Sequence, residues 1–147
     1  MGASIIQLPA VHDERGNLTF VESARHAPFE LKRIYYVYGV PAGEARAGHA
    51  HKTLHQLLIA VAGSFDVTID DGTHRQVFHL DHPEYGLHIP PMHWRLLENF
   101  SAGAVCLALA SDFYSEADYI REHDDFTRLL QAEKAGSAPE TRVKSGL

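Results

Sequence analysis

The chain has 147 residues, of which 45% are apolar and 22% are charged, a balance typical of one soluble globular domain. Its formal net charge of -6 argues against nucleic acid or an anionic membrane as a partner, while an anionic small molecule would need local positive charge. The single cysteine, Cys106, allows no disulfide within the chain. We find neither a secretory signal nor an apolar run of the ~20 residues that span a bilayer, and we expect a cytoplasmic protein.

Short segments of strand-like composition, separated by Gly, Pro, Asn and Asp, occupy most of the chain. The alternation of Phe65, Val67 and Ile69 with polar residues is typical of a half-buried strand, and Asp71-Gly72 predicts a hairpin turn after it. The same reasoning predicts strands at residues 4–8, 18–22, 33–38, 54–61, 65–69, 74–80, 86–90 and 104–110. Many short strands at this spacing predict an all-β fold, either an antiparallel barrel or a sandwich.

The pattern changes at Ser115. The spacing Ser115-x-x-Asp118 fits a helix-capping box, and apolar residues then recur at roughly helical spacing, at Tyr119, Ile120, Phe126, Leu129 and Leu130. We therefore expect a helix over residues 115–132 that lies against the β core. The polar composition of residues 133–147 predicts a flexible tail. The chain is thus expected to form a single domain over residues 1–132, including the helix.

Two histidines, His49 and His51, lie between a glycine turn and an apolar run at residues 57–61. In a strand, residues i and i+2 point to the same face, so the two imidazoles are expected side by side on one wall of a pocket. Such a pair can bind a metal or transfer protons. The chain has eleven histidines and most are expected to be surface or structural groups, but the same-face spacing singles out this pair.

Two patterns in the chain resemble the two signatures of the cupin superfamily. They are Gly43-x5-His49-x-His51-x4-Gln56-x6-Gly63 and Pro90-x-Met92-x-x-Arg95-x-x-x-Asn99. The resemblance implies a cupin-type antiparallel β-barrel, or jelly roll. Metal-binding cupins carry a glutamate where this chain has Gln56 and a histidine where it has Arg95, and an arginine cannot ligate a metal. A metal site would therefore need a third ligand, for which His93 is the available candidate.

Further segments resemble the cupin sugar 3,4-ketoisomerases that act on dTDP-linked sugars. They are Lys32-Arg33-Ile34-Tyr35-Tyr36, Arg46-Ala47-Gly48-His49-Ala50-His51-Lys52, Asp70-Asp71-Gly72 and Asp118-Tyr119-Ile120-Arg121. The similarity covers about residues 15–126, nearly the whole chain. It implies isomerisation of dTDP-4-keto-6-deoxy-D-glucose to the 3-keto sugar, without a metal or redox cofactor. It also implies a homodimer, with the N-terminal strand as a candidate for exchange between subunits.

This chemistry needs a base of near-neutral pKa and a donor for the developing oxyanion. We assign His51 as the leading candidate for the base and His49 as its partner, although the residues leave the order between them open. Tyr35 or Tyr36 is expected to donate a hydrogen bond to the oxyanion. Strand alternation sends only one of these two tyrosines toward the pocket, and the sequence does not say which.

Binding dTDP needs cations for the pyrophosphate and a flat surface for the base. The positive charges nearest the histidine motif are Arg33, Arg46 and Lys52, and arginine grips phosphate oxygens in a bidentate manner. The single tryptophan, Trp94, is expected either to stack on the substrate or to belong to the core. Arg15 and Arg95 are also assigned to the substrate, where they bear on the configuration at carbon 4, which the sequence does not settle.

Three other functions remain compatible with the sequence. The first is a metal-dependent cupin that uses His49, His51 and His93. The second is a sugar-nucleotide binding module without catalytic activity. The third is the related cupin 3,5-epimerase class, although the His-Ala-His-Lys context fits the isomerases better.

Overall fold

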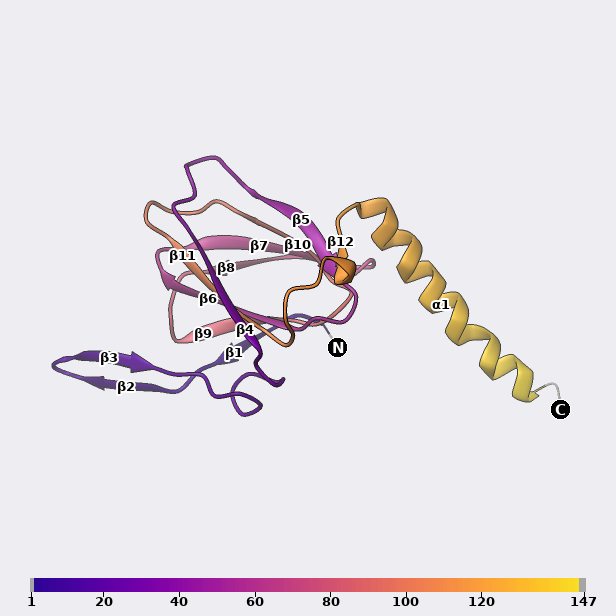
Figure 1. The fold of residues 1–147 in the computed structure, drawn as a ribbon, viewed down its shortest axis with the longest axis horizontal. Coiled ribbons are helices and arrows are strands. Elements are labelled where there is room, and N and C mark those ends of the chain that lie inside the picture. Colours follow the sequence, from indigo (N-terminus) through magenta and orange to yellow (C-terminus); the bar gives the residue numbers. More distant parts are fainter. Residues whose placement is uncertain (1, 146–147) are drawn as a thin grey trace.

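Two five-stranded antiparallel sheets stack on one another in the computed structural model, which describes residues 2–145 (Figure 1). The main core cluster lies between them and joins Leu58 of one sheet to Phe65, Val67 and Leu97 of the other. Burial of this apolar area is the main term that favours the fold. The predicted all-β antiparallel barrel with a C-terminal helix is confirmed.

The first sheet has the order β1 (Ser4–Gln7), β9 (Tyr85–Ile89), β6 (Gln56–Ala62), β11 (Val105–Ala110) and β4 (Arg33–Tyr38). The second has the order β12 (Tyr119–Ile120), β5 (Arg46–His51), β10 (Trp94–Glu98), β7 (Phe65–Asp70) and β8 (Arg75–Leu80). A separate hairpin pairs β2 (Ala10–Asp13) with β3 (Gly16–Thr19).

The local sequence pattern explains the strands that were predicted well. In β7 the side chains of Phe65, Val67 and Ile69 are buried while the residues between them are half-buried, which confirms the predicted alternation. Strand β6 is instead buried on both faces. Leu58 packs in the main core, whereas Leu57 packs on the opposite face with Leu8 and other residues of a second cluster. A central strand covered on both sides reads as a continuous apolar run.

The prediction differs from the structure in several strands and at the start of the helix, and strand β2 was not predicted. The predicted strand at 18–22 is wrong in extent, because β3 ends at Thr19 and pairs only with β2. Strand β10 was not predicted, although it pairs with β7 along its whole length and with β5 on its other edge. Its five residues carry too little pattern of their own, and the neighbouring strands determine its conformation.

The helix begins later than predicted. Helix α1 spans His123–Ser145, whereas residues 116–118 form a 3₁₀ helix and β12 pairs with β5. The capping interpretation was wrong because Ser115 makes no side-chain cap and Asp118 binds Thr53 instead. Helix α1 leads away from the barrel and continues through residues 133–145 of the predicted tail; residues 146–147 lie outside the described part (Figure 1). Within residues 2–145, no helix combines the length and apolarity needed to cross a membrane.

Trp94 anchors the start of α1 to the strand that carries the histidines. Its indole packs against Phe126 and His123 of α1, with ring centroids 5.8 and 5.0 Å apart. On its other side it covers Gly48, where an added Cβ would lie only 2.8 Å from the indole ring. Glycine at this position of β5 therefore allows the close approach of the tryptophan.

We expect Gly48→Ala to lower the free energy of unfolding by about 1–3 kcal/mol, the usual cost of overpacking, because the new methyl group displaces Trp94. Chemical denaturation measures this change. Gly2→Ala is the control, since a Cβ there meets nothing within 4 Å. Equal stability of Gly48→Ala and the wild type would show that the indole moves aside at no cost.

Two histidines form a stacked pair at the end of β6 and β9. Nδ1 of His55 lies 3.1 Å from Nε2 of His88, the rings are 6° from parallel, and both rings lie close to Phe29. Burial lowers the pKa of His88 to about 4, with a further contribution from His55, and burial also lowers the pKa of His55. The pair is therefore neutral at pH 7, and one ring donates its hydrogen bond to the other.

This pair makes stability depend on pH. Because the folded-state pKa of His88 lies below the ordinary value, the unfolded chain takes up protons first as pH falls below about 6.5. The free energy of unfolding should decrease toward pH 4, by at most about 1.4 kcal/mol per pH unit for each such histidine, and by less because the rings keep some contact with solvent. Denaturation at pH 7, 5.5 and 4.5 measures the slope.

His88→Gln should flatten this slope, whereas His74→Gln, which changes an exposed histidine, should leave it unchanged. Identical slopes for wild type and His88→Gln would assign the pH dependence to other groups.

Candidate active site

A cavity of about 580 Å³ opens between the two sheets, and His49 of the predicted histidine motif lines it. Its walls come from strands β4, β5, β6, β10, β11 and β12. The described residues that line it include four arginines and no aspartate or glutamate; the arginines are Arg33, Arg46, Arg95 and Arg121. A protein of net charge -6 thus concentrates positive charge in one hollow, which favours an anionic ligand.

The histidine pair lies on β5 as the i, i+2 spacing predicts. The two ring centroids are 4.9 Å apart in an edge-to-face arrangement, and Tyr119 lies against both rings. Antiparallel pairing sets His49 opposite Arg95 and His51 opposite Tyr119. His49 lines the cavity, whereas His51 is not in its lining and has 0% of its surface exposed. His49 therefore lies at the surface of the cavity wall, and His51 lies behind it.

A carboxylate orients the back histidine. Nδ1 of His51 lies 3.0 Å from Oδ2 of Asp118, and the other carboxylate oxygen accepts hydrogen bonds from the backbone N–H and the hydroxyl of Thr53, both at 2.8 Å. Burial raises the pKa of Asp118, but the bonds from Thr53 and His51 outweigh it and hold that pKa below its ordinary value. An ionised carboxylate only accepts, so Nδ1 of His51 carries the proton.

The remaining nitrogen of His51, Nε2, is therefore unprotonated. Burial lowers the pKa of His51, and the nearby Arg95 and His49 lower it further, so the imidazole is neutral at pH 7. Among the described residues, Nε2 of His51 is buried and has no hydrogen-bond partner. A neutral imidazole with an available lone pair, held by a carboxylate on its far side, is suited to proton transfer.

The wall next to the histidines carries a second polar group of three residues. Tyr35 oxygen accepts a hydrogen bond of 2.7 Å from Nε2 of Gln56, and Oε1 of Gln56 accepts one from Nη1 of Arg95. Burial raises the pKa of the Tyr35 hydroxyl and lowers that of Arg95 to about 10, so the tyrosine is neutral and the arginine charged at pH 7. All three residues line the cavity.

Strand alternation decides between the two candidate tyrosines. Tyr35 faces the cavity, whereas Tyr36 is 62% exposed on the outer face of β4, where its ring packs near Tyr38. The assignment of Tyr36 to the catalytic set is therefore corrected, because successive side chains of a strand point to opposite faces.

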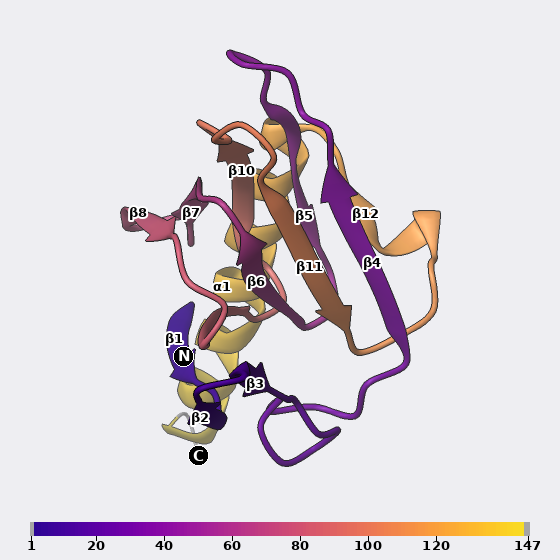
Figure 2. The ribbon, with the colours of Figure 1, turned by 90° about the vertical axis from the view of Figure 1, so that its left-hand side faces the viewer.

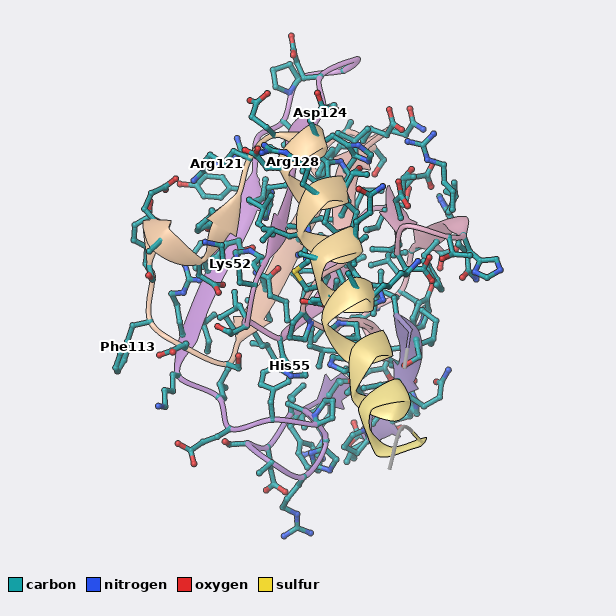
Figure 3. All side chains as sticks on the ribbon, turned by 90° about the vertical axis from the view of Figure 1, so that its right-hand side faces the viewer. Lys52, His55, Phe113, Arg121, Asp124 and Arg128 are labelled. Atoms are coloured by element: carbon teal, nitrogen blue, oxygen red, sulfur yellow. The ribbon has the colours of Figure 1, made fainter. Side chains whose placement is uncertain are left out.

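The structure brings some predicted substrate ligands together and separates others. Arg33, Arg46 and Arg95 line the cavity. Lys52 lines a neighbouring hollow of about 470 Å³, which shares Tyr119 and Arg121 with the cavity, and Figure 3 shows Lys52 and Arg121 on the same side of α1.

Two predicted ligands do not reach the cavity in this chain. Trp94 packs between β5 and α1, as described above, because the adjacent glycine leaves room for it there. Arg15 lies in the turn between β2 and β3, where its side chain is 86% exposed and pairs with Asp13. The hairpin lies at the end of the molecule opposite to α1 (Figure 1).

Three residues of the site were not assigned from the sequence: Asp118, Tyr119 and Arg121. They belong to a segment that the helical spacing misassigned, and a two-residue strand such as β12 has no periodicity of its own. Their presence in one of the segments that resemble the ketoisomerases was the available signal.

The metal-dependent alternative finds little support in the geometry. Nδ1 of His93 donates to the carbonyl of Pro91, 2.9 Å away, and His93 is not in the cavity lining. Among the residues whose side chains the structure describes, no three histidine, cysteine, aspartate or glutamate side chains come close enough together to hold a metal ion. The residues that face the cavity are instead a histidine, arginines and neutral polar groups.

Comparisons with known proteins identify the family of this chain. Residues 1–131 match the family described as FdtA: WxcM-like, C-terminal. The TDP-4-oxo-6-deoxy-alpha-D-glucose-3,4-oxoisomerase of Aneurinibacillus thermoaerophilus is 39% identical over 130 residues, covering 88% of this chain and 94% of that protein.

Two solved structures are also similar. The WlaRB TDP-quinovose 3,4-ketoisomerase of Campylobacter jejuni is 44% identical with a TM-score of 0.83, over 86% of this chain and 97% of that one. A variant of the QdtA 3,4-ketoisomerase of Thermoanaerobacterium thermosaccharolyticum, in complex with TDP-4-keto-6-deoxyglucose, is 35% identical with a TM-score of 0.85, over 86% and 92% of the two chains. The extent of the family match and these identities show that the chain belongs to the family described as FdtA: WxcM-like, C-terminal.

Proposed function

We propose that this protein is a sugar 3,4-ketoisomerase that converts dTDP-4-keto-6-deoxy-D-glucose to the dTDP-linked 3-keto sugar. The observation that carries the proposal is a pair of histidines, of which His51 is buried and neutral, beside a cavity whose described lining has four arginines and no carboxylate. The histidines supply a base of the right kind, and the arginines suit the pyrophosphate of a nucleotide sugar. The relatives named above are 3,4-ketoisomerases of TDP-linked sugars or bind one.

The reaction moves a carbonyl group from carbon 4 to carbon 3 and leaves the composition of the sugar unchanged. The ketone at carbon 4 acidifies the hydrogen on carbon 3, and a base removes that proton. The electron pair forms the carbon–carbon double bond of an enediolate, with negative charge on the oxygen at carbon 4. The proton of the hydroxyl at carbon 3 passes to the oxygen at carbon 4, and protonation of carbon 4 then gives the 3-keto sugar with a hydroxyl at carbon 4.

We assign His49 as the base that transfers the proton at carbon 3, because it is the histidine on the cavity wall. Its ring lies against His51, which Asp118 holds in one tautomer behind it. The prediction that His51 is the base requires the sugar to reach a ring with no exposed surface, so we propose the reverse order. In this arrangement His51 orients His49 and tunes its basicity.

Nucleotide binding is assigned to the arginines at the cavity mouth. The guanidinium of Arg33 lies 5.4 Å from the ring of Tyr35, and its Nε donates to the carbonyl of Asp112. The guanidinium of Arg121 stacks on Tyr119 at 4.2 Å and pairs with Glu116. Both arginines are thus held at the wall by neutral rings or by groups outside the cavity, and each keeps donors for phosphate oxygens.

The test is an NMR time course with dTDP-4-keto-6-deoxy-D-glucose in D₂O. We expect loss of the proton on carbon 3 and appearance of a 3-keto sugar, whose carbon-4 couplings give the configuration that the sequence left open. Exchange at carbons 3 and 5 would instead identify a 3,5-epimerase. Bound nucleotide without exchange would identify a binding module.

The order of the histidines is tested with two matched variants. His49→Asn should lower kcat by ~10²–10⁴-fold, as expected when a general acid–base group is removed. His51→Asn should lower it by only about 10-fold, because its role is orientation. Nucleotide affinity by calorimetry should be unchanged in both. A larger loss in His51→Asn than in His49→Asn would return the role of base to His51.

We also propose that two copies of the chain associate through the outer face of the first sheet. Figure 2 shows β4, β11 and β6 side by side, and on their outer face Ile34, Tyr36 and Val61 are 56%, 62% and 42% exposed. A hollow of about 420 Å³ adjoins this face and includes Phe20, just beyond β3. Exposed apolar groups gathered on one face mark an interaction surface, and the projecting hairpin β2–β3 is the segment that would reach the partner copy.

We expect Ile34→Glu to weaken this dimer in sedimentation equilibrium, because it places a charge in the apolar interface. Val77→Glu is the control, since Val77 is 60% exposed but lies on β8 of the other sheet. A wild-type monomer at micromolar concentration would contradict the proposal. The cytoplasmic location stays a prediction that rests on the single, buried Cys106.

A further inference from the structure

We propose that Gln56 is a positioning residue of the isomerase, which directs the hydroxyl proton of Tyr35 into the cavity and leaves the charge of Arg95 without a carboxylate partner. This inference rests on the proposed function. Both groups then face the oxygen on which the enediolate develops its negative charge. Gln56 itself is 1% exposed, and its two amide atoms are engaged by Arg95 and Tyr35.

The orientation of the Gln56 amide follows from its neighbours. An arginine can only donate hydrogen bonds, so the amide atom that meets Nη1 of Arg95 is the oxygen. The amide nitrogen therefore faces Tyr35 and donates to its oxygen. Because the phenol oxygen accepts in this bond, its own proton is directed elsewhere, and Tyr35 lines the cavity. A hydroxyl proton fixed in this way is a preorganised donor for an oxyanion.

The described hydrogen bonds of Arg95 all go to neutral acceptors. Its Nε and Nη2 both donate to the backbone carbonyl of His93, at 3.3 and 3.2 Å, and Nη1 donates to the Gln56 amide. Among the described residues, no carboxylate accepts a hydrogen bond from this guanidinium, which is 1% exposed, and Asp118 acts on its charge only from a longer distance. A buried charge without a counter-charge in direct contact is costly. It becomes favourable when an anion forms next to it, as the enediolate does.

A glutamate at position 56 would remove both effects. It would be ionised beside Arg95 and neutralise the positive charge of the site. As an acceptor-only group it would also take the hydroxyl proton of Tyr35, which would then point away from the cavity. The glutamate that metal-binding cupins carry at this position has the same size as Gln56 and differs only in charge and donors. The amide is therefore the feature that matters for this chemistry.

The test is a double-mutant cycle of Gln56→Glu and Tyr35→Phe in the NMR assay of isomerisation. Tyr35→Phe should lower kcat by about 10²-fold in the wild type, the usual cost of losing one oxyanion donor. Gln56→Glu should cost at least as much, with KM changed less than about 3-fold. In the Gln56→Glu background, Tyr35→Phe should cost less than about 3-fold more, because the donor is already diverted.

Gln76→Glu, an equal change of charge on an exposed position of β8, should leave kcat unchanged. Thermal unfolding is measured for each variant to check that it folds. If Gln56→Glu does not fold, Gln56→Met replaces it in the cycle, and its effect with Tyr35→Phe should again be less than multiplicative. If the wild type is active and the effects of the two substitutions multiply, the inference about Gln56 fails while the proposed function stands. A wild type without turnover would overturn the proposed function, and the inference with it.

Discussion

The carboxylate of Asp118 is the group on which the geometry of the site depends. It binds Nδ1 of His51 and both donors of Thr53, and the backbone carbonyl of Asp118 accepts from the N–H of Lys52. These bonds join β12 to the end of β5, which places Tyr119 against the histidines. They also satisfy an ionised group that would otherwise be partly buried without a partner. One residue thus closes the edge of a sheet and sets the tautomer of a histidine.

The charge of Arg95 links the base to the oxyanion. Burial lowers the pKa of His51, the histidine behind the proposed base His49, and the charge of Arg95 lowers it further, which keeps that imidazole neutral; the same charge would attract the enediolate once the proton has left carbon 3. A carboxylate paired with Arg95 would weaken both effects. The neutral partners that the structure provides, Gln56 and the carbonyl of His93, satisfy its donors without cancelling its charge. The proposed reaction therefore depends on what the cavity lacks as well as on what lines it.

The sequence predicted those features that follow from local periodicity. Alternation identified β7 and placed His49 and His51 on one face, and it required that Tyr35 and Tyr36 separate. The structure was needed where long-range contacts decide. Trp94 packs over Gly48 and α1 rather than in the cavity, which depends on a glycine 46 residues away. The pairing of β12 with β5 overrode a helical pattern, since two strand residues gain their stability from the neighbouring strand and the Asp118 bonds.

Arg95 and Gln56 also explain how a cupin-like barrel can be adapted to acid–base chemistry. Carboxylate and histidine at these two positions make an anionic or neutral set of ligands for a cation. Amide and guanidinium make a set of donors with net positive charge, which attracts an anion and disfavours a cation in the same place. The histidine pair is common to both sets, and its neighbours decide whether its lone pairs serve a metal or a proton. In this chain Arg95 favours the proton, because its positive charge beside His51 opposes a second cation there.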